Sequence, residues 1–259
     1  MHSAQCTVSG IERAVEQSIR IMRNKLSEPL SIDDMARFAM YSKFHFSREF
    51  HRLTGISPKR FLSALRIQEA KRLLLTTGMT VTDISCSVGY SSVGTFSSRF
   101  TNSVGLPPSL YRQFGGYATQ INVARNMGAG ESVRGFVTAP TVAELGLIFL
   151  GIFPTRVPEG RPISCTVLLT PGPFEMKNVP PGVWYLLGHS VPATAHEALT
   201  DGLPVHVGSL GPLEIRSRAA HAVVEFPLRG VRVLDPPVLM ALQQVRSAAF
   251  ENNPVQPVG

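Results

Sequence analysis

The sequence has few of the residues from which cross-links, membrane spans and metal centres are built. Its three cysteines, Cys6, Cys86 and Cys165, are widely separated and have no metal-ligand spacing. No apolar run approaches the roughly eighteen residues that cross a bilayer. The first residues do not have the basic, apolar and cleavage-site order of a secretion signal. We therefore expect reduced thiols and a cytoplasmic location.

Enzyme motifs are absent as well. The sequence has no HExxH, no glycine-rich phosphate loop and no Gly-x-Ser-x-Gly. Cys165 lies in an apolar segment with no adjacent base, which favours a buried structural thiol over a nucleophile. We therefore expect no enzyme, no metal and no cofactor. The histidines of the second half are too dispersed for a metal site: His189, His196, His206 and His221.

Positive charge is concentrated in the first half of the chain. Residues 1–124 contain fifteen Lys and Arg against eight Asp and Glu, a net charge of +7, whereas residues 125–259 contain ten of each. A basic surface attracts polyanions and releases their counterions. Sixteen of the twenty prolines lie in the second half, so the composition predicts two domains of different structure.

The basic half contains one helical pattern twice. Two phenylalanines, a glycine and a proline recur fifty residues apart, whereas the preceding small apolar pair recurs after forty-nine. The second copy therefore has one extra residue in its turn, at Gly89-Tyr90. Such a repeat indicates a duplicated supersecondary unit. The matched positions are Phe46, Phe50, Gly55 and Pro58 with Phe96, Phe100, Gly105 and Pro108, and Met35 and Ala36 with Ile84 and Ser85.

Each copy is typical of a helix-turn-helix. Ser31 and Thr80 each precede a short helix and have an Asp three residues later, as N-caps do. After a turn, Ser42, and Ser91 or Ser92, can cap a second helix. Gly55 and Gly105 are expected to end these second helices in the left-handed conformation. Helices are also predicted over residues 10–26, by apolar periodicity, and over residues 59–76.

These residues resemble the DNA-binding domain of the AraC/XylS family of transcriptional regulators. The resemblance covers roughly residues 11–117. It is carried by residues 28–36 (EPLSIDDMA), 45–58 (HFSREFHRLTGISP) and 105–112 (GLPPSLYR). It implies a regulator that binds double-stranded promoter DNA, with RNA polymerase as a further candidate partner.

The helix over residues 59–76 sets the distance between the two motifs. Eighteen residues at 1.5 Å each span about 27 Å, close to the roughly 34 Å of one DNA turn. We expect the second helix of each motif, its recognition helix, to enter one of two successive major grooves.

Base contacts are expected from the early, outward positions of each recognition helix. Arg48 is the strongest candidate, because a guanidinium can bridge guanine O6 and N7. For Phe44, partial burial in the core and contact with a thymine methyl remain alternatives. The second motif departs from the family, which often has a long polar or basic side chain at Val93, Gly94 and Ser98; we expect it mainly to contribute positioning contacts. The candidates are Lys43, Phe44, Ser47, Arg48, His51, Val93, Gly94, Thr95, Ser97 and Ser98 for bases, and Arg52, Lys59, Arg60, Arg99 and Arg112 for phosphates.

The second half is predicted to be a β-sandwich with a terminal helix. Short apolar runs punctuated by Pro and Gly indicate strands, and Asp235-Pro-Pro is typical of a helix start, here over residues 235–250. Residues 172–187 resemble a hairpin of carboxypeptidase-regulatory or transthyretin-like sandwiches. The predicted domains are therefore 1–117 for DNA binding, 118–131 as a linker and 132–259. The predicted strands are 132–138, 145–153, 163–170, 174–177, 183–190, 205–209, 213–216, 221–226 and 231–234.

Two roles for this half remain open. A small-molecule sensor would need a pocket, whereas a module for self-association or for binding another protein would need an exposed apolar face, for which the helix over residues 235–250 is a candidate. A small-molecule effector and a second copy of the chain are thus further candidate partners. The aromatic residues that could line a ligand pocket are Phe149, Phe153, Phe174, Trp184 and Tyr185.

Overall fold

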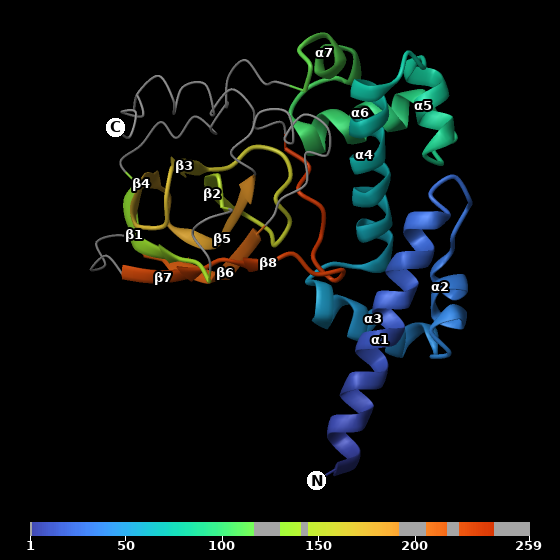
Figure 1. Ribbon diagram of the computed structural model, residues 1–259, viewed down its shortest axis with the longest axis horizontal. Helices are drawn as coiled ribbons and strands as arrows, with labels where there is room; N and C mark the ends of the chain where they lie inside the picture. The colour runs from blue at the N-terminus through green and yellow to red at the C-terminus, as the bar shows by residue number, and fades with distance from the viewer. Residues whose placement is uncertain (1, 117–129, 141–144, 192–205, 217–222, 241–259) are drawn as a thin grey trace, which may run out of the picture. The chain divides into compact units, whose positions relative to one another are not determined.

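The computed structural model describes residues 2–116, 130–140, 145–191, 206–216 and 223–240 (Figure 1). The chain forms two compact units. The first combines Met1–Phe100 with Arg232–Leu239, and the second combines Thr101–Val231 with Met240–Gly259. The predicted linker, 118–131, lies almost entirely outside the described residues.

The helical part follows the predicted order of elements. The first helix begins earlier than predicted, and the apolar face that suggested it is buried: Ile11, Val15, Ile19 and Met22. Two helix-turn-helix motifs follow, joined by one long helix. The elements are α1 (His2–Asn24), α2 (Ile32–Phe38), α3 (Lys43–Thr54), α4 (Pro58–Thr76), α5 (Val81–Ser87), α6 (Val93–Val104) and α7 (Pro108–Gln113).

Local hydrogen bonds explain where these helices begin. Ser31 and Asp34 form a complete capping box at the start of α2, and the Thr80 side chain accepts a hydrogen bond from the backbone N–H of Asp83. The backbone N–H of His45 donates to Ser42 Oγ at 3.4 Å, and that of Thr95 to Ser92 Oγ at the same distance. Of the two serines predicted to cap α6, Ser92 therefore does so.

The helix ends and turns also follow the repeat. Gly55 (φ 78°) and Gly105 (φ 91°) adopt the predicted left-handed conformation. In the turns, Met40 (φ 57°) corresponds to Gly89 (φ 84°), forty-nine residues later. Because Ser42 corresponds to Ser92, fifty residues later, the extra residue of the second motif follows Tyr90.

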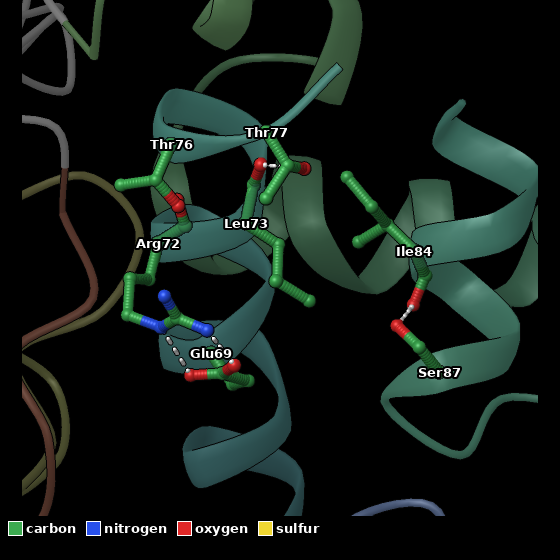
Figure 2. Close-up of polar contacts among 7 residues, drawn as sticks. All are labelled: Glu69, Arg72, Leu73, Thr76, Thr77, Ile84 and Ser87. Carbon is green, nitrogen blue, oxygen red and sulfur yellow. Dashed lines mark hydrogen bonds and ion pairs between the residues drawn. The ribbon is translucent and has the colours of Figure 1, made fainter. Parts of the chain in front are cut away.

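The long helix α4 ends without a left-handed glycine, since its C-cap Thr77 is extended, whereas the short helix α5 is followed by Gly89 (φ 84°). At the end of α4, Thr76 Oγ1 donates to the carbonyl oxygen of Arg72 at 2.9 Å, and Thr77 Oγ1 to that of Leu73 at 2.7 Å (Figure 2). Arg72 is exposed and makes a two-point ion pair with Glu69. The hydroxyl of Thr77 thus adds a second hydrogen bond to the Leu73 carbonyl, which already accepts from the backbone N–H of Thr77 at 3.1 Å. At the end of α5, Ser87 Oγ donates in the same way to the carbonyl oxygen of Ile84.

The β-strands form two sheets. One is three-stranded with the order β4-β1-β7, and the other is five-stranded with the order β3-β2-β5-β6-β8. All neighbouring strands are antiparallel except β1 and β7. The strands are β1 (Glu131–Thr138), β2 (Leu147–Phe153), β3 (Ser164–Leu168), β4 (Pro173–Val179), β5 (Gly182–Val191), β6 (His206–Ile215), β7 (Val223–Pro227) and β8 (Arg229–Gly230).

Side chains of both sheets form one hydrophobic core. Phe226 of β7 is fully buried, and its ring occupies the space beside Gly188 of β5 and Gly208 of β6, where any side chain would collide with it. Two neighbouring strands of one sheet thus accommodate one aromatic ring of the other. The core contains Val133, Val137, Leu145, Ile148, Leu150, Ile152, Phe174, Met176, Val179, Leu186, Phe226 and Leu228.

Three predictions about the second half are wrong in detail. The two strands expected over 205–209 and 213–216 form the single strand β6, which continues through Gly211 and Pro212. Residues 231–234 are not a strand. The helix expected from Asp235 does not begin there, because Asp235 Oδ2 accepts from the backbone N–H of Arg232 and closes the preceding turn. Pro236 and Pro237 then favour an extended chain; residues 241–250 lie outside the described residues.

Candidate nucleic-acid interface

The first recognition helix, α3, is held by its apolar face. Phe46 and Phe50 are fully buried, and Phe50 makes an edge-to-face contact with Phe61 of α4. The opposite face is left to solvent, as the predicted base contacts require. Lys43, Phe44, Arg48, His51 and Arg52 are exposed, while Ser47 is half-buried.

Phe44 lies at the surface and not in the core. Its side chain is 86% exposed, and Met40 in the preceding turn is 91% exposed. Both lie among basic residues, which is unusual for large apolar side chains unless they meet a partner. Of the two alternatives for Phe44, partial burial is therefore excluded.

Glu49 holds two of the arginines of α3. Its carboxylate accepts from Arg52 Nε at 2.8 Å and lies 3.5 Å from Arg48 Nε. The hydrogen bond from Arg52 lowers the pKa of Glu49 below its usual range, and Arg48 acts in the same direction. Arg48 Nη2 also lies 3.1 Å from His45 Nδ1. Arg48 and Arg52 are thus pre-oriented along one face, beside a fixed negative charge that sequence reasoning missed.

The second recognition helix, α6, presents a small and weakly charged face. Gly94, Thr95 and Ser98 are exposed, while Val93 and Ser97 are half-buried. The buried side repeats the arrangement of α3, since Phe96 and Phe100 are fully buried and Tyr90 packs edge-on against Phe96. The two motifs therefore share an apolar core but differ in the chemistry that they expose.

Arg99 and Arg66 lie toward the protein interior. Arg99 is half-buried and its Nε donates to Ser63 Oγ of α4 at 3.1 Å, while Ser63 Oγ lies 3.3 Å from the hydroxyl of Tyr90. Arg66 of α4 donates to the carbonyl oxygens of Leu26 and Glu28 at 2.9 and 2.8 Å. Burial lowers the pKa of Arg66. The spacing of apolar residues cannot identify such half-buried arginines, because it assigns every charged residue to the exposed face of a helix.

The remaining phosphate candidates lie at helix starts and ends. Lys59 is exposed in the first turn of α4, where Arg60 is half-buried and its backbone N–H donates to Ser57 Oγ. Arg112 is half-buried in the last turn of α7. Lys43 at the start of α3 makes an exposed ion pair of 2.9 Å with Asp33. Exposed pairs of this kind are weak, so Lys43 can exchange Asp33 for a phosphate at little cost.

The five aromatic candidates for a ligand pocket do not lie together on one face. Phe174 is part of the core between the sheets, and Trp184 packs against that core with its Nε1 donating to the carbonyl oxygen of Pro180. Phe153 pairs directly with Tyr185, whose ring lies under the guanidinium of Arg156. Phe149 stacks on His189. Because neighbouring residues of a strand point to opposite faces, Phe149, Phe153 and Tyr185 lie on the face away from this core, whereas Phe174 and Trp184 lie on the core side.

A metal site is not evident in the part of the chain that the structure describes. It contains no cluster of His, Cys, Asp and Glu able to bind a metal. Burial raises the pKa of Cys165, as expected of a structural thiol. None of its helices is long and apolar enough to cross a membrane.

The fold and the exposed face of α3 define a class of protein: two helix-turn-helix motifs on a shared connecting helix, with a basic recognition helix in the first. Residues 35–113 match a family of helix-turn-helix domains. The chain belongs to the helix-turn-helix transcriptional regulators with an AraC-type DNA-binding domain.

Similar regulators come from bacteria. A regulator of Bacillus subtilis, YobQ, is 37% identical over 95 residues, which are 37% of this chain and 39% of YobQ. The transcriptional activator AarP of Providencia stuartii is 35% identical over 91 residues, which are 35% of this chain and 67% of AarP. The chain thus spans about two fifths of YobQ and two thirds of AarP.

Two solved structures are similar to part of this chain. An AraC-type regulator from Chromobacterium violaceum is 28% identical and is matched over 40% of this chain and 94% of its own, with a TM-score of 0.39. The DNA-binding domain of AdpA, solved in complex with a target DNA, is 25% identical over 44% of this chain and 97% of its own, with a TM-score of 0.38.

Proposed function

We propose that this protein regulates transcription by placing α3 and α6 in successive major grooves of promoter DNA. The observation that carries the proposal is the exposed face of α3, where Arg48 and Arg52 are pre-oriented and Phe44 is solvent-exposed. Arg48 reads a guanine and Phe44 contacts a thymine methyl. The nineteen residues of α4 span about 28 Å, which suits recognition helices one DNA turn apart.

The two motifs contribute differently to binding. The first reads bases through Lys43, Ser47, Arg48 and His51, with Arg52 on a phosphate. The second, which exposes Gly94, Thr95 and Ser98, mainly fixes the register. Lys59, Arg60 and Arg112 contact phosphates, and Arg99 supports α6 from within.

The direct test is binding of the full-length chain to genomic DNA fragments at increasing salt. Affinity should fall steeply with salt, because each neutralised phosphate releases counterions. Arg48→Ala should weaken binding, whereas Arg134→Ala is a matched control, since Arg134 is an ion-paired surface arginine of β1. Absence of salt-dependent binding by the parent chain would refute the proposal.

We propose self-association or protein binding as the role of the β half. The outer face of the three-stranded sheet exposes Val223 to 78% and Phe136 to 49%, and exposed apolar side chains of this kind mark interaction sites. The sandwich is of the transthyretin-like kind. A small-molecule sensor is the alternative, and RNA polymerase, an effector or a second copy are the candidate partners. Sedimentation at several concentrations, with Phe136→Ser and Val223→Ser, tests self-association.

A further inference from the structure

The C-terminal turn of α6 is hydrogen-bonded to the segment that joins β2 to β3. Within the second unit, the backbone N–H of Gly160 donates to the carbonyl oxygen of Ser103 at 2.8 Å. Ser103 Oγ donates to Glu159 Oε2 at 3.2 Å. Ser103 is fully buried, whereas Glu159 and Gly160 are half-buried.

These bonds supply what the end of a helix lacks. The last four carbonyl groups of an α-helix have no helical N–H partner. In α6, which ends at Val104, the N–H of Gly105 satisfies the carbonyl of Thr101 at 2.8 Å. The carbonyl of Ser103 is a later one of this group, and Gly160 provides its donor from a segment far away in the sequence.

The first copy of the repeat has a side-chain bridge at the same helix end. Thr54 Oγ1 lies 2.8 Å from the carbonyl oxygen of Phe50 and 3.0 Å from that of Ile56, and it accepts from the N–H of Ile56. Fifty residues later, the residue at the position of Thr54 is Val104, which has no hydroxyl. The second copy therefore lacks this hydroxyl bridge at the helix end that the β2–β3 segment reaches.

The backbone of the β2–β3 segment comes close to α6 at Gly160. Gly160 has a φ of +74°, a conformation that side chains disfavour, and an added Cβ would lie 3.2 Å from the carbonyl oxygen of Asn102. The backbone conformation and the close contact with α6 each favour glycine at this position.

We propose that Glu159 and Gly160 are positioning residues for the second recognition helix, at the helix end where the first copy has the Thr54 bridge. The functional part of this inference rests on the proposed DNA binding. It follows that the second motif, unlike the first, depends on the β half for the order of its recognition helix. A change in the β2–β3 segment would then alter DNA contact at one half of the site only.

Hydrogen exchange of the full-length chain without DNA tests the structural part. Gly160→Ala and Ser103→Ala should each make the last turn of α6 exchange about fivefold to tenfold faster, while the last turn of α3 keeps its rate. Gly230→Ala is the control, because an added Cβ there meets no atom within 4 Å. Unchanged rates in α6, or equal increases in both helices, would overturn the proposal.

A restoring substitution makes the test sharper. Val104→Thr gives α6 the hydroxyl that Thr54 gives α3, at nearly the same volume. In the Gly160→Ala background it should return hydrogen exchange in the last turn of α6 to within about twofold of the parent rate. The new hydroxyl bridge would then hold this turn without the β2–β3 segment. Exchange that stays fast in the double variant would show that the segment and the hydroxyl bridge do not hold the same turn.

Footprinting then tests the functional part. Gly160→Ala should weaken protection of the half-site bound by α6 and leave the half-site bound by α3 protected. Equal loss at both half-sites would overturn the positioning role. If the parent chain protects no DNA at all, the proposed function fails, whereas the exchange result still decides whether the segment closes α6.

Discussion

The guanidinium of Arg66 lies over the ring of Tyr90, with 5.9 Å between its central carbon and the ring centroid. The same group donates to the carbonyl oxygens of Leu26 and Glu28. Leu26 and Glu28 precede the first motif, and Tyr90 closes the turn of the second. One side chain of α4 therefore joins both copies of the repeat.

This arrangement predicts that Arg66→Ala lowers the stability of the protein. The substitution removes the charged donor of two carbonyl groups, one part-buried and one exposed, which should cost about 1.5–3 kcal/mol of unfolding free energy. Arg66→Lys should recover only part of this, because an ammonium cannot bond both carbonyls and also lie flat over Tyr90. Denaturant unfolding measures the effect, with the exposed Arg48→Ala as the control. Equal stabilities of the Arg66 and Arg48 variants would contradict the bridging role.

DNA binding should be asymmetric between the two motifs. Arg48→Ala should weaken the free energy of DNA binding by about 1–3 kcal/mol and relax base preference at one half-site. Thr95→Ala, at an exposed position early in α6, should cost less, because a hydroxyl contact is weaker and less selective. Quantitative footprinting on one fragment compares the two variants directly. Similar losses would mean that α6 reads bases as strongly as α3.

Much of the helical half was predictable because its signals are local. Caps at Ser31, Ser42 and Thr80 and the left-handed glycines 55 and 105 depend on neighbouring residues only, and all are confirmed. The roles of Arg66 and Ser103 could not be predicted because their hydrogen-bond partners lie thirty-eight or more residues away. The helix predicted from Asp235 was wrong for a different reason. A capping residue can serve the turn before it or the helix after it, and the Asp235 carboxylate closes the turn before it.

Glu49 should restrain the affinity of α3 for DNA. Its carboxylate lies between Arg48 and Arg52, close to where phosphates would bind. Glu49→Gln keeps the shape and removes one negative charge, so binding should tighten by about 0.5 kcal/mol, the Coulomb energy of two charges some 8 Å apart in water. Glu69→Gln, which loses the corresponding partner of Arg72 on α4, is the control. Weaker binding by Glu49→Gln would show instead that the carboxylate is needed to orient the arginines.

Gly105 offers a test of backbone strain without steric contact. It has a φ of +91°, and an added Cβ would meet no atom within 4 Å. Gly105→Ala should therefore lower the free energy of unfolding only through backbone strain, by about 1–2 kcal/mol. Gly105→Val should lower it further, because β-branched residues tolerate this backbone region least. Thermal unfolding of the full-length chain measures both, with Gly78→Ala as a control at another position without near contacts. Parent-like melting of Gly105→Val would refute the glycine's role as a helix stop.

Lys71 should make stability depend on pH in the alkaline range. Its Nζ lies 3.5 Å from the carbonyl oxygen of Val238, in the segment Arg232–Leu239 that belongs to the first unit. Burial lowers the pKa of Lys71 from 10.5 to about 8. Between these two values the unfolded chain binds more protons than the folded chain, so stability rises with pH in this window. Below about pH 8 the folded state carries the full cost of the buried charge.

Lys71→Met should therefore be more stable than the parent at pH 7, and its advantage should shrink by about 1–3 kcal/mol as the pH rises from 8 to 10.5. Subtracting the variant from the parent at each pH cancels the titration of tyrosines and cysteines, which both proteins share. Lys59→Met, at an exposed lysine of α4, should show a constant difference across the same range. The contrary result is that the parent and Lys71→Met differ in unfolding free energy by the same amount from pH 8 to 10.5. That result would mean that the amine is solvated and that the segment 232–239 does not shield it.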